Sequence, residues 1–203
     1  MNPTLLFLGL LALAGAQTEV PLPVPPPPAE GMVRVSTSGS PFHVVMPEFS
    51  DLPAITLNDY WIDKFEVTNA QYKQFVAAGG YGKREFWRQE FLKDGKVIPW
   101  EQAVGTFTDT TCRPGPATWE AGSYPGGRDN YPVTGLSWYE AAAYAEYAGK
   151  VLPTIFHWGR AAAQSSSGDI VPLSNFGGRD LAPVGTQRSM HRFGARDLSL
   201  IHI

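Results

Sequence analysis

The segment 131–163 constrains the fold of this 203-residue chain more than any other stretch. Ser137 and Glu140 form the Ser-x-x-Glu pattern of a capping box, in which each side chain hydrogen-bonds to the other residue's backbone N–H at a helix start. Alanines dominate the following residues, and Gly149 suits the position just past a helix end. Thr154 then predicts the N-cap of a second helix. We therefore expect two short helices joined by a tight extended link.

Composition narrows the class of protein. The chain is 43% hydrophobic and 12% aromatic, which is typical of a folded globule, and its length favours one domain. The net charge is −3 and there is no run of Lys or Arg, so nucleic acid is not the expected partner. With 21 glycines and 18 prolines, we expect many turns and little regular secondary structure.

The first thirty residues predict export. Residues 5–16 are apolar but too few for a stable membrane span, and the small residues 14–16 suit signal cleavage. We interpret residues 1–16 as a signal peptide and expect a periplasmic or extracellular protein. Residues 17–30 form a proline-rich linker with six prolines at 21–28. We interpret it as a stiff polyproline II spacer, the alternative being a ligand for an SH3-type domain.

The body of the chain predicts short strands and one further clear helix. Thr68 and Gln71 form a second capping box, and a pair of glycines at 79–80 ends the helix that follows it. Apolar alternation and aromatic content predict strands before this helix. The candidate strands are 32–35, 42–46, 55–57 and 60–65.

Residues 81–130 contain many turn signals and one short helix candidate at 100–104. Their abundant aromatic residues predict ordered loops that pack onto the core. Cys112 lies here and is the only cysteine, so no disulfide forms within the chain. We interpret Cys112 as a small buried apolar residue rather than a reactive thiol.

Three blocks in this order resemble the formylglycine-generating enzyme family, also called the sulfatase-modifying factor family. The resemblance implies an α+β, C-type-lectin-like fold with low regular secondary structure, extending over residues 31–197. The blocks are 62–69 with Tyr72, Phe75 and Val76; 132–133 with 136–138, Ala141, 143–144, 148–150 and 152–154; and 174–177 with 183–185 and 193–194.

The chain departs from the family pattern in three places. The family's early Gly-Gly-x-Phe-x-Met-Gly turn is only loosely matched by residues 38–42. The enzymes carry an acidic Glu-Ala-Glu-Trp-Glu run after 152–154, whereas residues 155–160 here keep only Trp158. Residues 198–203 do not continue the family sequence, and we interpret them as a sequencing artefact at the end of an incomplete domain; a natural short variant is the alternative.

The resemblance also bears on cofactors. The family's enzymes bind copper(I) through two cysteines, whose soft thiolates suit that ion. Because this chain offers only Cys112, we assign it no catalytic residue and expect copper only in a full-length enzyme. Asn175 and the carbonyl of Phe176 match a calcium-binding position of the family, with Asp180 as the candidate acidic partner; a structural asparagine turn is the alternative. His157 lies on a predicted helix and is interpreted as a packing or capping residue.

Two functions follow from these expectations. In the first, the chain is a truncated, exported domain whose full-length parent is a copper-dependent oxidase that converts a cysteine of a sulfatase-type protein to formylglycine. In the second, it is a non-catalytic lectin-like binding or sensor module on a proline-rich stalk. A peptide or protein is the expected partner of the first, and a peptide or glycan is that of the second.

Overall fold

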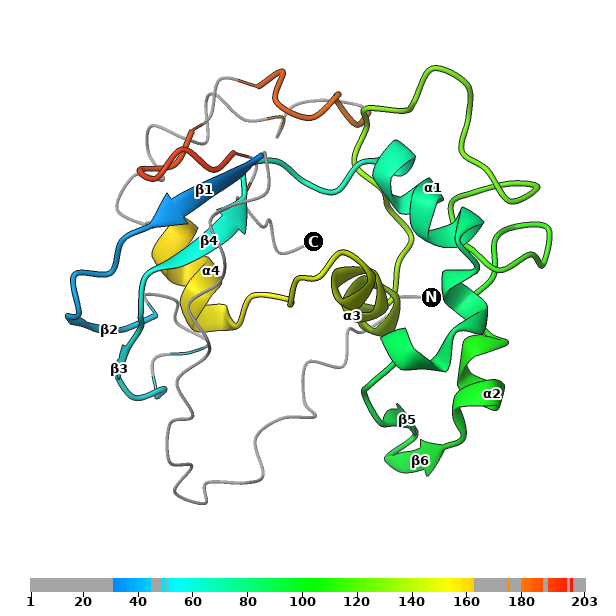
Figure 1. Ribbon diagram of the computed structural model, residues 1–203, viewed down its shortest axis with the longest axis horizontal. Coiled ribbons are helices and arrows are strands. Elements are labelled where there is room, and N and C mark those ends of the chain that lie inside the picture. The colour runs from blue at the N-terminus through cyan, green and yellow to red at the C-terminus, as the bar shows by residue number, and fades with distance from the viewer. Residues whose placement is uncertain are drawn as a thin grey trace.

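The computed structural model describes residues 31–44, 49, 51–162, 175, 180–187, 190–196 and 198 (Figure 1). Within these residues the strands pair two by two in antiparallel fashion, and no larger sheet forms. Short helices and long ordered loops make up the rest, so the expected α+β fold with little regular secondary structure is confirmed. The expected signal peptide and linker, residues 1–30, lie outside the described residues.

The longest strand pair joins the start of the described chain to the segment before the first helix. β1 (Met32–Val35) is antiparallel to β4 (Tyr60–Asp63), with Met32 opposite Asp63. β4 ends two residues before the predicted boundary. The Lys64 N–H still donates to Gly31, the next residue opposite in the pair, but its carbonyl accepts from the N–H of Arg196.

The second pair is shorter than the sequence predicts. β2 (Pro41–Phe42) pairs with β3 (Ile55–Thr56), whereas strands at 42–46 and 55–57 were expected. Residues 45 and 46 lie outside the described residues. Leu57 is buried, and its carbonyl accepts from the Thr37 hydroxyl at 2.5 Å instead of extending the strand pair.

Both capping boxes are confirmed. α1 (Asn69–Ala77) starts after Thr68, whose N–H donates to Gln71 Oε1 at 2.9 Å. α3 (Trp138–Tyr147) starts after Ser137, whose N–H donates to Glu140 Oε2 at 2.7 Å.

The sequence also predicts correctly where α3 ends and where the next helix begins. Gly149, just past the C-cap of α3, takes a left-handed conformation with φ of 67°. α4 (Ile155–Ala162) then begins after Thr154, whose hydroxyl accepts from the N–H of His157 at 3.4 Å.

Residues 81–130 contain more regular structure than the sequence analysis expects. The predicted helix at 100–104 is confirmed as α2 (Trp100–Val104), and two 3₁₀ turns, η2 (Gly80–Gly82) and η3 (Arg84–Phe86), precede it. The hairpin of β5 (Phe91–Lys93) and β6 (Lys96–Ile98) was not predicted. Its turn is Asp94–Gly95, both with positive φ, as the favoured two-residue hairpin turn requires.

The core is dominated by aromatic side chains, as expected from the loop composition. Tyr72 and Phe75 from α1 are fully buried and pack against rings from 81–119 and from α3. The other large buried rings are Tyr81, Trp87, Phe91 and Trp119. The irregular segment is therefore held by packing rather than by a hydrogen-bonded sheet.

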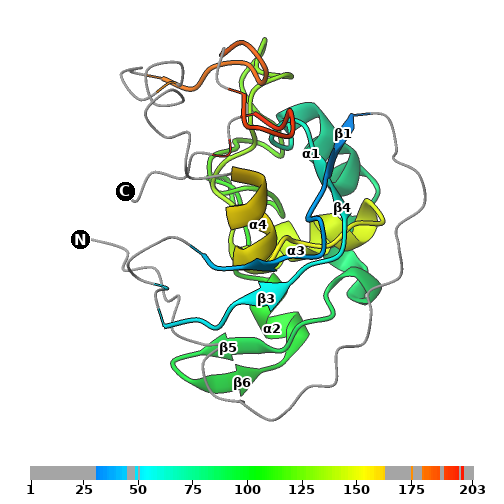
Figure 2. The same ribbon diagram turned by 90° about the vertical axis from the view of Figure 1, so that its left-hand side faces the viewer.

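α4 lies beside the β1–β4 pair, as Figures 1 and 2 show. The Tyr60 ring meets the His157 ring edge-on at 4.7 Å between centroids, and the Tyr60 hydroxyl donates to the His157 carbonyl. Lys150 Nζ lies 2.6 Å from Asp63 Oδ1 and ties the end of α3 to β4. None of the described helices is long and apolar enough to cross a membrane.

Candidate functional site

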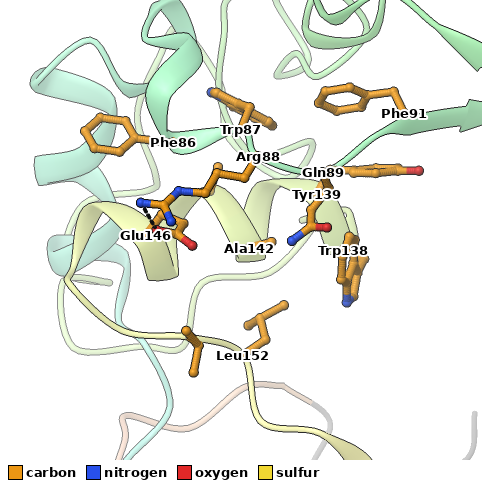
Figure 3. Close-up of a pocket in the computed structure, with 12 residues that line it drawn as sticks. Phe86, Trp87, Arg88, Gln89, Phe91, Trp138, Tyr139, Ala142, Glu146 and Leu152 are labelled. Atoms are coloured by element: carbon orange, nitrogen blue, oxygen red, sulfur yellow. Dashed lines mark ion pairs between the residues drawn. The ribbon is translucent and has the colours of Figure 1, made fainter. Parts of the chain in front are cut away.

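A groove of about 160 Å³ runs between α3 and the segment that carries η3 and β5 (Figure 3). Residues 151–152, in the link between α3 and α4, form its opposite wall. Two residues of the lining are largely exposed: Trp138 at 54% and Val151 at 74%. The other lining residues are Phe86, Trp87, Arg88, Gln89, Phe91, Tyr139, Ala142, Ala143, Glu146 and Leu152.

Helical spacing explains why α3 can form this groove. Trp138, Ala142 and Glu146 recur every four residues, so they lie on one face of the helix. Ala142 and Ala143 are small and leave room at the floor of the groove, whereas Trp138 extends from the first turn as one side of it.

Residues 86–91 form the wall of the groove that faces residues 151–152. The Phe91 ring lies 4.6 Å from the Tyr139 ring, and the Tyr139 hydroxyl accepts from the backbone N–H of Leu92 at 3.0 Å. These contacts hold β5 against the start of α3. Figure 3 shows Gln89 beside Trp138, which places an amide group next to the exposed indole.

One ion pair borders the groove at its other end. Arg88 Nη2 lies 3.1 Å from Glu146 Oε2, and the two side chains are 69% and 25% exposed. The charges are matched, so the groove itself is largely apolar and neutral. This surface suits an uncharged, partly apolar polypeptide segment, with Gln89 and the Trp138 N–H as hydrogen-bond donors.

A buried polar network supports the opposite face of α3. Tyr81 donates to Glu140 Oε1 at 2.6 Å and its hydroxyl lies 3.1 Å from that of Tyr72. Burial raises the pKa of Glu140, although the bonds from Tyr81 and Ser137 partly oppose that shift. Burial also raises the pKa of Tyr81, and neighbouring Tyr72 and Glu140 raise it further. The network orients α3.

A second buried carboxylate organises the loop that contains Cys112. Asp109 accepts hydrogen bonds from the backbone N–H groups of Thr111, Arg113 and Gly122, the last at 2.6 Å. Burial opposes its ionisation, but these bonds outweigh that effect and lower the pKa of Asp109 to about 2.

The interpretation of Cys112 as a buried residue is wrong. Its side chain is exposed and its thiol is free. Cys112 is the last residue of a four-residue turn that begins at Asp109. Its N–H donates to the Asp109 carbonyl at 3.1 Å. Its φ of 63° keeps the backbone in the left-handed region, so the turn geometry outweighs the preference of a thiol for burial.

The predicted calcium residues are only partly described. Asn175 is exposed and its amide donates to the Asp180 carbonyl at 2.9 Å; Phe176 lies outside the described residues. The Asp180 carboxylate lies 2.5 Å from Arg128 Nη2, and that bond lowers the pKa of Asp180. Calcium binding here remains a prediction, and it would require Asp180 to turn away from Arg128.

His157 packs and caps, as the sequence analysis expects. Its Nδ1 lies 2.7 Å from the Thr154 hydroxyl, and burial lowers its pKa. Across the described part of the chain, no group of three or more His, Cys, Asp and Glu side chains could hold a metal ion.

Comparison with known families identifies the class of protein. The profile of the sulfatase-modifying factor enzyme 1-like domain matches residues 23–194, so this chain belongs to the FGE-sulfatase family. The resemblance predicted from the three sequence blocks is thereby confirmed, together with the C-type-lectin-like fold that it implied. The boundaries 31–197 remain a prediction.

Individual relatives differ in function. A formylglycine-generating enzyme of Thermomonospora curvata is 33% identical over 179 residues, which cover 79% of this chain and 56% of that protein. A hercynine oxygenase of Mycolicibacterium thermoresistibile is 31% identical over 71% of this chain and 32% of its own length. An inactive Cα-formylglycine-generating enzyme 2 of Mus musculus is 26% identical over 60% and 42%. The chain thus spans about half or less of the length of these relatives.

The copper site implied by the family does not fit this sequence. A two-thiolate site needs two cysteines, and the printed sequence has one, which lies exposed in the Asp109 turn. No step that requires copper can therefore be assigned to the residues present.

The groove was missed by the sequence analysis, although part of its signal was present. Trp138, Ala142 and Glu146 are spaced as one helix face, and an amphipathic reading of the segment would have grouped them. Arg88, Gln89 and Val151 join them only through tertiary packing, which no local pattern reveals.

Proposed function

We propose that this chain is the polypeptide-binding part of an FGE-family protein, and that the groove beside α3 is where the polypeptide binds. The observation that carries the proposal is the exposure of Trp138 and Val151 in the lining of one largely apolar groove. Exposed aromatic side chains that line a groove are typical of binding surfaces.

The parent reaction is proposed from the family. We infer that the full-length protein oxidises a cysteine of a sulfatase-type polypeptide to formylglycine, and that the thiolates which bind copper come from sequence outside these 203 residues. The residues present would hold the polypeptide and orient it, with Gln89 donating to its backbone and Trp138 packing on its apolar side chains.

The single cysteine and the altered 155–160 segment favour a second candidate function. In it the protein is a non-catalytic binding or sensor module that uses the same groove. The relative named as inactive belongs to the same family, which makes a non-catalytic role a real alternative.

Binding and conversion assays distinguish the catalytic function from the non-catalytic one. Peptides tiled along a sulfatase-type protein of the same genome would be titrated against the full chain, against Trp138→Ala and against Val97→Ala, an exposed valine outside the groove lining. We expect Trp138→Ala to weaken binding about tenfold or more and Val97→Ala to leave it unchanged. Equal binding by both variants would remove the groove as the site.

The longer product of the same gene would then be loaded with copper(I) and incubated with the bound peptide. Mass spectrometry would report conversion of the peptide cysteine to formylglycine, which we expect of the longer product and not of the 203-residue chain. A longer product that binds the peptide but leaves its cysteine intact would support the non-catalytic module.

A further inference from the structure

Two alanines of α3 set the depth of the groove. Ala142 and Ala143 are the smallest of the lining residues, and every other one carries a side chain of at least valine size. Ala143 is fully buried and belongs to the core. Ala142 is half-buried and lies on the helix face shared with Trp138 and Glu146, so its methyl group is the part of the floor that meets a ligand. Figure 3 shows Ala142 between Leu152 and the segment 88–89.

The groove has room for one large side chain. Its volume is about 160 Å³, and an apolar cavity of about 150 Å³ holds one benzene-sized molecule. A segment of several residues does not fit in that volume. A bound polypeptide therefore inserts one side chain and leaves its backbone at the rim, where Gln89 can donate to it.

The walls select an uncharged, apolar side chain. Aromatic and aliphatic side chains line them, among them Phe86, Tyr139 and Leu152. The charges at the border, Arg88 and Glu146, already form an ion pair with each other. A charged ligand side chain would lose its hydration without meeting an unpaired opposite charge, and that loss is costly. Phenylalanine, leucine and methionine match both the volume and the polarity of the groove.

We propose that Ala142 determines which side chain the groove accepts: the polypeptide inserts one large, uncharged apolar residue over the Ala142 methyl group and against the Trp138 ring. This inference rests on the proposed function and adds to it the identity of the anchor residue, which is phenylalanine, leucine or methionine. A few anchors that fill pockets carry most of the binding free energy of an interface. A larger residue at position 142 would occupy the space that the anchor needs.

Matched changes in the chain and in the peptide test the proposal. The peptide is the tiled peptide that binds most tightly, together with copies in which each of its Phe, Leu and Met residues is replaced by alanine in turn. All are titrated against the full chain and against Ala142→Ser, Ala142→Val and Ala142→Leu, a series of increasing side-chain volume. Ala141→Leu is the control, because Ala141 is half-buried on the same helix but is not in the groove lining. Thermal unfolding measured by circular dichroism verifies that each variant is folded.

We expect alanine at the anchor position to weaken binding to the original chain about tenfold or more. Ala142→Leu should weaken binding of the original peptide by a similar factor and leave binding of the alanine copy unchanged. Ala142→Val should be intermediate, and Ala142→Ser should resemble the original chain. Equal losses for the two peptides, no dependence on the size of residue 142, or the same loss in Ala141→Leu would overturn the proposal.

A probe that is not a polypeptide separates this inference from the proposed function. N-acetylphenylalanine amide is an uncharged mimic of the anchor alone, and N-acetylalanine amide is its matched control. Saturation-transfer NMR with the full chain should detect binding of the first and not of the second, and Ala142→Leu should remove that binding.

The two proposals then fail in different ways. If the tiled peptides depend on Trp138 but neither they nor the phenylalanine amide respond to residue 142, the binding site stands and the anchor is rejected. If no tiled peptide binds while the phenylalanine amide binds in an Ala142-dependent manner, the selective pocket stands and the polypeptide substrate is rejected. Absence of binding by the peptides and by the amide would reject both proposals.

Discussion

Two regions of this molecule are stabilised in different ways. Residues 67–150, called here the aromatic half, contain α1, α2, α3 and the buried rings of the core. The described residues among 31–65, 151–162 and 180–196, called the strand half, contain the β1–β4 and β2–β3 pairs and α4. Among the described residues, every close ring pair lies in the aromatic half except Tyr60 with His157.

In the strand half, aromatic rings pack mainly against cationic side chains, a contact that the aromatic half also makes, for example between Arg128 and Tyr131. The Arg160 guanidinium lies over the rings of Phe42 and Phe193, at 5.9 and 5.7 Å. Among the described residues, three buried polar atoms of the strand half lack a hydrogen-bond partner: Arg160 Nε, His191 Nε2 and Arg196 Nε. In the aromatic half, Trp100 Nε1 is the one such atom among the described residues. Each such atom costs free energy, whereas cation–π contacts contribute modestly. The packing that stabilises the described residues is therefore concentrated in the aromatic half.

The largest expected effect is in the aromatic core. Phe75 is fully buried and its ring lies within 6.1 Å of five others, so Phe75→Ala should lower the free energy of unfolding by about 3–5 kcal/mol. The matched control is Phe42→Ala in the strand half, where the ring is only half-buried. Urea denaturation measures both, and equal losses would contradict the contrast between the halves.

The next effect concerns the buried carboxylate of α3. Glu140→Ala removes the partner of the Tyr81 hydroxyl and of the Ser137 N–H, so it should cost about 2–3 kcal/mol. Glu140→Gln keeps an acceptor for Ser137 and should cost less. Thermal unfolding of the two variants tests this, and a larger loss for the amide than for alanine would argue against the network.

A pH-dependent effect is expected from Asp109. Its folded pKa of about 2 lies below the value of an unfolded aspartate, near 3.9, so its contribution is present above pH 4 and is lost as pH falls from about 4 to 2. Asp109→Asn should lower the melting temperature at pH 7 and flatten its acid dependence. A variant whose acid transition matches that of the original chain would show that Asp109 is not responsible.

The smallest effect is expected where the halves meet. Lys150 and Asp63 are each about one-third exposed, at 31% and 32%, so their ion pair should contribute only about 0.2–1 kcal/mol. Lys150→Met keeps the aliphatic packing and isolates the charge. Denaturation at low and high salt measures the contribution, and a loss above this range would mean that the halves depend on each other more than the packing indicates.

Local signals in the sequence predict much of the aromatic half. Capping boxes define the starts of α1 and α3 because their hydrogen bonds involve residues three positions apart. The hairpin at β5–β6 carried an equally local Asp-Gly signal at 94–95 that the sequence analysis did not use.

Tertiary contacts explain what was not predicted. Cys112 is exposed because Asp109 fixes its turn, and that carboxylate takes its donors from residues up to thirteen positions away. The groove likewise joins 86–91 to α3 and to 151–152. β3 and β4 are shorter than predicted. The carbonyl groups just past their ends accept hydrogen bonds from Thr37 and Arg196, and the periodicity of the sequence does not reveal such partners.

Backbone hydrogen bonds join the two ends of the segment 67–133. Val133 N–H donates to Val67 at 2.9 Å, Asn69 N–H donates to Tyr131 at 2.9 Å, and Ala70 N–H donates to Asp129 at 3.0 Å. The two ends of some sixty residues therefore meet, and changing the length between them alters the closure entropy only slowly, about 0.6 kcal/mol for each doubling. The segment is thus tied at its two ends by backbone bonds and along its length by the rings that it buries against α3.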